Sequence, residues 1–107
     1  MTLYELLEEL KQVDLETYRK WFNDHDILGL DQWQLDSLQG CIQRACEKRE
    51  WSITLSFNYD LDRTKTWMVE ICDNEWTVIG ITEGYDSAVE SLLVAYITAV
   101  KEEKQLL

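Results

Sequence analysis

The chain has 107 residues, 46% of them hydrophobic, and its 21 acidic against 10 basic side chains give a formal net charge of −11. This length predicts one domain over residues 1–107, because two halves would each be too small to bury a useful core. The charge disfavours the usual mode of nucleic-acid binding, in which Lys and Arg neutralise phosphates, and it disfavours anionic membrane surfaces for the same reason.

Targeting and redox features are absent from the sequence pattern. No stretch approaches the roughly 20 apolar residues that a membrane span needs. The first ten residues, MTLYELLEEL, carry acids where a signal peptide carries positive charge, so we expect a cytoplasmic protein. Cys41, Cys46 and Cys72 form no C-x-x-C pair, which predicts free thiols and neither a disulfide framework nor a zinc site. We expect no metal and no cofactor.

Capping residues mark two short helices at the start of the chain. Thr2 and Glu5 form a capping-box pattern, and apolar residues at helical spacing follow, which predicts a helix from Leu3 to about Gln12. Asp14 is a good cap for a second helix, from Leu15 to about Asp24.

A third helix is predicted to open at Asp31, with Gln34 completing the capping pattern, and to run to about Lys48. Basic residues near its end favour the negative pole of the helix dipole: Arg44, Lys48 and Arg49. Its inner face is predicted to consist of Leu35, Leu38, Ile42 and Ala45.

From Trp51 the hydrophobic period changes from 3.6 to 2, which is typical of strands. Three strands are predicted, from Trp51 to Tyr59, Thr66 to Cys72 and Glu75 to Ile81, with a turn at Asp73-Asn74. In the first strand the inward residues are expected to be Trp51, Ile53, Leu55, Phe57 and Tyr59, and in the second Trp67, Val69 and Ile71.

The last helix is expected after a strand break at Glu83-Gly84, with Ser87 and Glu90 as its capping box. Ala88, Ala95 and Ala99 would allow close approach to a sheet, and the inward stripe is Val89, Leu92 or Leu93, Tyr96, Ile97 and Val100. The predicted class is therefore α+β, with three N-terminal helices (residues 1–50), then a three-stranded antiparallel meander and a long C-terminal helix packed on the sheet (residues 51–107).

Two families share parts of this pattern. The order of helix, three-stranded meander and helix from Asp31 to Lys104 resembles the topology of double-stranded-RNA-binding domains, but Glu83, Asp86 and Glu90 stand where that family has phosphate-binding Lys residues. The segment W-x-V-x-G followed by a G-x-x-S helix start resembles small α/β/α sandwich proteins of bacteriophages, a likeness carried by Trp76, Val78, Gly80, Gly84 and Ser87. The second resemblance implies a mobile-element origin without an activity.

Patterns of catalysis and metal binding are weak. The single histidine, His25, could be a general base beside Asp24 or Asp26, but a solvated turn explains N-D-H-D better. A calcium loop begun at Asn58 or Asp60 lacks the Gly at its sixth and the Glu at its twelfth position. A phosphate-binding P-loop, G-x-G-x-x-G and H-E-x-x-H do not occur in the sequence. We therefore expect a protein without enzymatic activity, and an enzyme with a Cys nucleophile is the minor alternative.

Five tryptophans divide into two groups. Trp51, Trp67 and Trp76 each begin a predicted strand, so we expect cross-strand core packing. Trp21 and Trp33 lie outside the apolar stripes of their helices, so both an interface role and a core role remain open for them.

These observations favour a small acidic module that binds a protein with a basic surface and does not bind nucleic acid directly. In a phage or mobile element, such a module would inhibit a host nucleic-acid-handling complex, as anti-CRISPR proteins do. The alternative is a homo-oligomeric structural or accessory protein that pairs through the edge strand from Trp51 to Tyr59. The candidate partner-binding residues are Trp21, Trp33, Asp60, Asp62, Asp73, Glu75, Glu83 and Asp86.

Overall fold

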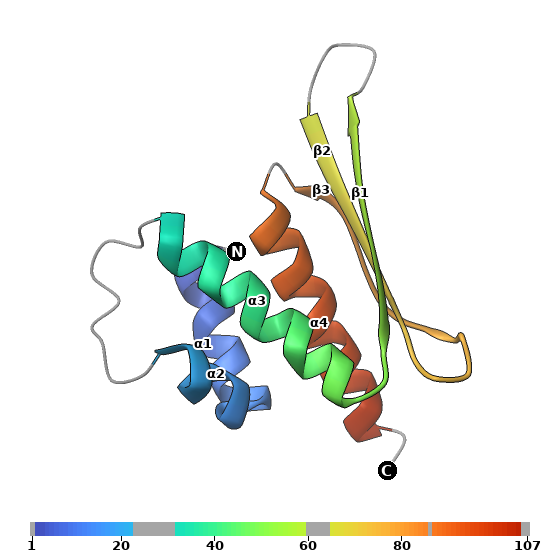
Figure 1. The fold of residues 1–107 in the computed structure, drawn as a ribbon, viewed down its shortest axis with the longest axis horizontal. Helices are drawn as coiled ribbons and strands as arrows, with labels where there is room; N and C mark the ends of the chain where they lie inside the picture. Colours follow the sequence, from blue (N-terminus) through green and yellow to red (C-terminus); the bar gives the residue numbers. More distant parts are fainter. Residues whose placement is uncertain (1, 23–31, 60–64, 86, 106–107) are drawn as a thin grey trace.

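The helices lie on one side of a small sheet in the computed structural model (Figure 1). The structure describes residues 2–22, 32–59, 65–85 and 87–105. The predicted α+β class and element order are confirmed, with elements α1 (Leu3–Val13), α2 (Leu15–Phe22), α3 (Gln32–Lys48), β1 (Ser52–Tyr59), β2 (Lys65–Cys72), β3 (Val78–Tyr85) and α4 (Ala88–Gln105).

The helix starts follow the predicted caps. Thr2 and Glu5 make a reciprocal capping box at α1. Asp14 accepts the amide of Thr17 at 3.2 Å ahead of α2, and Ser87 accepts the amide of Glu90 at 3.4 Å in the first turn of α4. Within the described ranges, none of the helices is long and apolar enough to cross a membrane.

The sheet is an antiparallel meander in the order β1-β2-β3. In Figure 1 all four helices lie on one side of it, and no described element covers the other face. Helix α4 packs on β2 and β3, while α1 and α3 pack against α4 and α3 also reaches β1. One face of the sheet is therefore covered by helices, and the other face is uncovered within the described residues.

Close packing of α4 on β3 depends on small residues. A Cβ added to Gly80 would lie 2.2 Å from the carbonyl oxygen of Ala95, and Ala95 and Ala99 are fully buried. The predicted role of these alanines in close approach is confirmed. The matching role of Gly80, whose missing side chain makes room for the helix backbone, was not predicted.

One hydrophobic core joins both parts of the chain. Its members come from all four helices and from β2 and β3. The predicted inward residues of α3 and α4 are buried or packed against this core, and Val69 and Ile71 of β2 are fully buried. Cys46 is also fully buried, whereas Cys41, five residues earlier and on a different face of α3, is half-buried.

The prediction for β1 is wrong beyond its first residues. Ile53 packs against the core, but Leu55, Phe57 and Tyr59 are exposed on the side that was expected to be inward. The reason is geometric, because α4 covers β2 and β3, and the end of the β1–β2 hairpin extends past the first turn of α4 in Figure 1.

The prediction for β3 is also wrong at both ends. The strand begins at Val78 rather than Glu75, and it continues through Glu83 and Gly84 to Tyr85. The later start follows from a longer turn between β2 and β3, which puts Trp76 in the turn, where its side chain is 77% exposed and not in the core.

Candidate functional site

The turn that joins β2 and β3 is held by the carboxylate of Asp73. Its Oδ1 accepts the amides of Glu75 and Thr77, both at 2.9 Å. The backbone closes the same turn, since the amide of Asp73 donates to the carbonyl of Thr77 at 2.9 Å. The predicted partner-binding residue Asp73 thus has a structural role here, and Glu75 remains exposed beside it.

This turn presents Trp76 to solvent in an unusual backbone conformation. Its φ of 65° lies in the left-handed region, which is uncommon for a bulky residue. Val78 and Ile81 follow along the chain and are about half exposed. They pair with Cys72 and Glu70, which alternate along β2 with buried core residues, so Val78 and Ile81 lie on the face of the sheet that α4 does not cover. We call Trp76, Val78 and Ile81 the Trp76 surface.

The predicted acidic residues do not form one patch. Asp73 and Glu75 lie in the turn that carries Trp76. Glu83 pairs with Met68 and lies five residues after the first residue of β3, which is about 17 Å along the strand. The predictions for Asp60, Asp62 and Asp86 and for the side chain of Glu83 lie outside the described residues.

Of the two helical tryptophans, only the Trp21 side chain is described. Its Nε1 donates to the carbonyl of Gln34 at 2.9 Å, and its ring meets the ring of Tyr18 edge-on with centroids 6.1 Å apart. Trp21 is half-buried and joins α2 to α3. Trp33 lies in the first turn of α3, and the prediction for its side chain lies outside the described residues.

A second exposed apolar group lies on the edge strand β1. The ring of Phe57 lies 5.0 Å from that of Tyr59 and 4.8 Å from that of Trp67, measured between centroids. Leu55, Phe57 and Tyr59, which we call the β1 aromatic row, are the residues that were expected to be inward.

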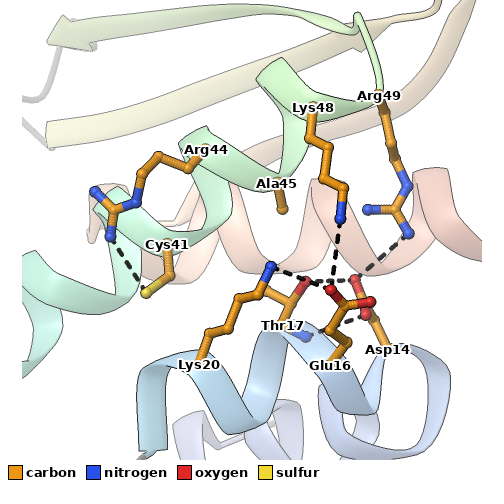
Figure 2. Close-up of a pocket in the computed structure, with 9 residues that line it drawn as sticks. All are labelled: Asp14, Glu16, Thr17, Lys20, Cys41, Arg44, Ala45, Lys48 and Arg49. Atoms are coloured by element: carbon orange, nitrogen blue, oxygen red, sulfur yellow. Dashed lines mark hydrogen bonds and ion pairs between the residues drawn. The ribbon is translucent and has the colours of Figure 1, made fainter.

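A cleft of about 500 Å³ separates α2 from the second half of α3 (Figure 2). Four of the chain's ten Lys and Arg residues line it, together with two acids, so that the cleft carries a formal charge of +2 in a chain of −11. The charged lining residues are Asp14, Glu16, Lys20, Arg44, Lys48 and Arg49.

Sequence reasoning missed this cleft, because it assigned the cations of α3 only to the helix dipole. Arg44 and Lys48 are one helical turn apart and therefore share a face. That spacing was a readable signal, but only the tertiary structure places Lys20 of α2 opposite them.

Glu16 lies between two cations at the cleft mouth. Its Oε1 is 3.1 Å from Nζ of Lys20 and 3.5 Å from Nζ of Lys48 (Figure 2). The hydrogen bond from Lys20 and the positive charge of Lys48 lower the pKa of Glu16. Arg44 instead donates to Sγ of Cys41 at 3.5 Å.

Behind the cleft lies a buried polar cluster around Asp14, whose side chain is 9% exposed. Its Oδ2 accepts the hydroxyls of Tyr96 and Thr17, the latter at 2.7 Å, and lies 3.5 Å from the guanidinium of Arg49. Arg49 also donates to the Tyr96 hydroxyl at 2.7 Å. The cluster connects the start of α2, the end of α3 and the middle of α4. From the sequence, Asp14 was predicted to be a helix cap alone.

The polar cluster shifts the ionisation of its members. Burial opposes the charge on Asp14, but hydrogen bonds from Tyr96 and Thr17 and the charge of Arg49 together lower its pKa. Burial and the bond to Asp14 raise the pKa of Tyr96. The pair Asp14 and Arg49 is therefore ionised at neutral pH, with a neutral tyrosine between them.

Two of the thiols, Cys46 and Cys72, are not activated. Burial raises the pKa of Cys46 to about 12, and burial and the neighbouring Glu70 raise the pKa of Cys72. Both are protonated at neutral pH and are poor nucleophiles. Within the described residues, no three His, Cys, Asp or Glu side chains are grouped as a metal site requires.

The fold and these surfaces define a small acidic α+β protein with exposed apolar groups at both ends of its sheet. Comparison with protein-family models, with characterised proteins and with solved structures finds no match to this chain. The resemblances to phage sandwich proteins and to double-stranded-RNA-binding domains stay predictions.

Proposed function

We propose that this protein is a non-enzymatic binding module that acts in the cytoplasm, and that its Trp76 surface contacts a basic surface on a partner protein. One observation carries the proposal: Trp76 is 77% exposed while its backbone is held in the left-handed region. Such a conformation costs about 1 kcal/mol for a residue other than Gly, and strain of this kind clusters at functional sites.

The chemistry of this surface suits a protein partner. Tryptophan is among the residues that contribute most binding energy when they become buried at an interface. Val78 and Ile81 extend the apolar area, and Glu75 is an exposed acid beside it. The net charge of −11 would speed encounter with a basic surface and would repel nucleic acid.

The same charge supports a narrower form of the proposal. Protein surfaces that hold DNA or RNA are basic, because they neutralise phosphates. An acidic protein that occupies such a surface blocks the nucleic acid. In a phage or mobile element, this module would inhibit a host nucleic-acid-handling complex in the manner of an anti-CRISPR protein.

Replacing Trp76 with Gly is expected to abolish partner binding and to stabilise the fold. Gly adopts a positive φ without steric cost, so the free energy of unfolding should rise by about 0.5–1 kcal/mol. Partner capture is measured by quantitative mass spectrometry on immobilised protein, and stability by urea unfolding. A simultaneous gain in stability and loss of binding separates a binding role from a structural one.

Glu50 provides the matched control, because its φ of 61° is also left-handed, at the end of α3. Glu50→Gly should stabilise the protein to a similar extent and leave partner capture intact. Association with the captured protein should slow as salt increases. Capture that survives in Trp76→Gly, or association rates that ignore salt, would contradict the proposal.

A second candidate function, a homo-oligomeric structural protein, is favoured by the β1 aromatic row. It lies on an edge strand whose backbone is unpaired on one side within the described residues. If copies pair through β1, light scattering gives the mass of a dimer. Tyr59→Thr, which keeps strand propensity, should then give a monomer, while Tyr4→Gln, at an exposed tyrosine of α1, should not. A wild-type monomer at all concentrations excludes this candidate.

A further inference from the structure

We propose that the cleft between α2 and α3 binds a small anion with two or more negative charges, such as a phosphate ester or a polycarboxylate. This site is independent of the Trp76 surface, which lies on the β2–β3 turn. The cleft has a net positive lining in a strongly acidic chain, and its volume of about 500 Å³ falls in the range typical of small-molecule sites.

The cations of the cleft divide into bound and available ones. Arg49 is held by Asp14, Glu103 and Tyr96 and lies against the ring of Trp51, so it forms part of the rigid back of the cleft. Within the described residues, Arg44 has no carboxylate within ion-pair distance. Its planar guanidinium is suited to paired contacts with the oxygens of phosphate or carboxylate.

Glu16 occupies the position that a ligand would take between Lys20 and Lys48. The three side chains are 61 to 71% exposed, and exposed ion pairs of this kind are weak and screened by salt. A ligand with at least two charges can displace this single carboxylate and also contact Arg44. We infer that Lys20, Lys48 and Arg44 bind the anion and that Glu16 competes with it.

The test is an amide NMR titration of the full chain at about 0.15 M NaCl with inorganic pyrophosphate and, separately, with citrate. We expect saturable shifts confined to α2 and to the second half of α3. Tighter binding of pyrophosphate identifies a phosphate site, and tighter binding of citrate a carboxylate site. The absence of localised shifts with both anions up to about 10 mM overturns the proposal.

Two matched pairs of variants test the assignment of residues. Arg44→Gln should weaken binding at least tenfold, whereas Arg19→Gln, on α2 but outside the cleft lining, should change it less than twofold. Both variants remove one positive charge. Equal weakening by the two would show that only net charge matters and would overturn the site.

Glu16→Gln should strengthen binding about tenfold, because it removes the competing carboxylate and frees Lys20 and Lys48. Glu102→Gln, at an exposed acid of α4, removes the same charge elsewhere and should strengthen binding less than twofold. Unchanged shifts in the sheet would show that both variants remain folded. If Glu16→Gln binds no more tightly than Glu102→Gln, Glu16 does not compete and the proposed arrangement is wrong.

Discussion

Replacing Gly80 with Ala is expected to lower the free energy of unfolding by about 3 kcal/mol, at the upper end of the usual range for overpacking. The added Cβ would lie 2.2 Å from the carbonyl oxygen of Ala95 and 3.2 Å from Cβ of Ala99. The closest atom belongs to the backbone of α4, so no side-chain rotation can relieve the contact. The helix must move away from the sheet and loosen the core beneath it. Urea unfolding followed by circular dichroism measures the loss.

Gly40→Ala is the matched control, since it makes the same chemical change in the interior of α3. Its Cβ would meet only the guanidinium of Arg44, at 3.2 Å, which is the mobile end of a long side chain. Helix propensity then dominates, and a gain of about 0.5–1 kcal/mol is expected. A loss below about 1 kcal/mol for Gly80→Ala would show that α4 does not pack this closely on β3.

Replacing Asp14 with Asn is expected to cost about 2–4 kcal/mol at neutral pH, somewhat below the range for fully buried pairs because Arg49 is 27% exposed. Asn caps helices as well as Asp, so the substitution keeps the start of α2 and removes the charge. The variant leaves Arg49 beside Tyr96 and Glu103 without its most buried counter-charge. Thermal unfolding of the wild type and the variant measures the difference.

The contribution of Asp14 should also depend on pH in a defined direction. Its pKa is lowered in the folded state, so the folded state binds this proton less readily than the unfolded chain does. The stabilisation is fully present above the unfolded value of about 4 and is lost as the pH falls through the lower folded value. Asp14→Asn should remove this part of the acid sensitivity.

Glu16→Gln is the control for the pH experiment, because its ion pairs are exposed and should hardly affect stability. Tyr96→Phe tests the same cluster from the other side. It removes the hydroxyl that links Asp14 to Arg49 and should cost about 1–3 kcal/mol. If Asp14→Asn and Glu16→Gln have equal effects, the buried cluster does not stabilise the fold as described.

Local signals in the sequence were enough to predict where the helices begin and which of their faces are buried. Caps at Thr2, Asp14 and Ser87 depend on residues three positions apart, and the inward faces of α3 and α4 follow from the helical period. These features require no knowledge of distant parts of the chain. The class and the order of elements could therefore be predicted correctly.

Burial of the strands was harder to predict, because alternation identifies two faces but does not say what covers them. Phe57 and Tyr59 alternate as a buried row would, yet no helix reaches that end of β1 in the described residues. Trp76 was misplaced for a local reason: the Asp73 carboxylate accepts the amides of Glu75 and Thr77 and thereby delays the start of β3. A turn closed by an Asp side chain was a readable alternative.

The candidate sites could not be predicted from the sequence for a different reason. Asp14 and Tyr96 are 82 residues apart, and Lys48 and Glu16 are 32 apart, so only the assembled helices bring them together. The net charge of the chain also concealed a cleft of opposite sign. Composition averages over the surface, whereas ligand binding depends on which charges are neighbours.

Helix α4 is the last of the described elements, and it contacts the first. Lys101 pairs with Glu9, and Lys104 donates to the carbonyl of Val13. Because a ribosome releases the N-terminal residues first, α1 and its buried residues Leu6, Leu7 and Leu10 lack the packing of α4 until residues 88–105 have emerged. The native core can close only after α4 has been synthesised. During that interval the nascent chain presents an amphipathic helix to chaperones.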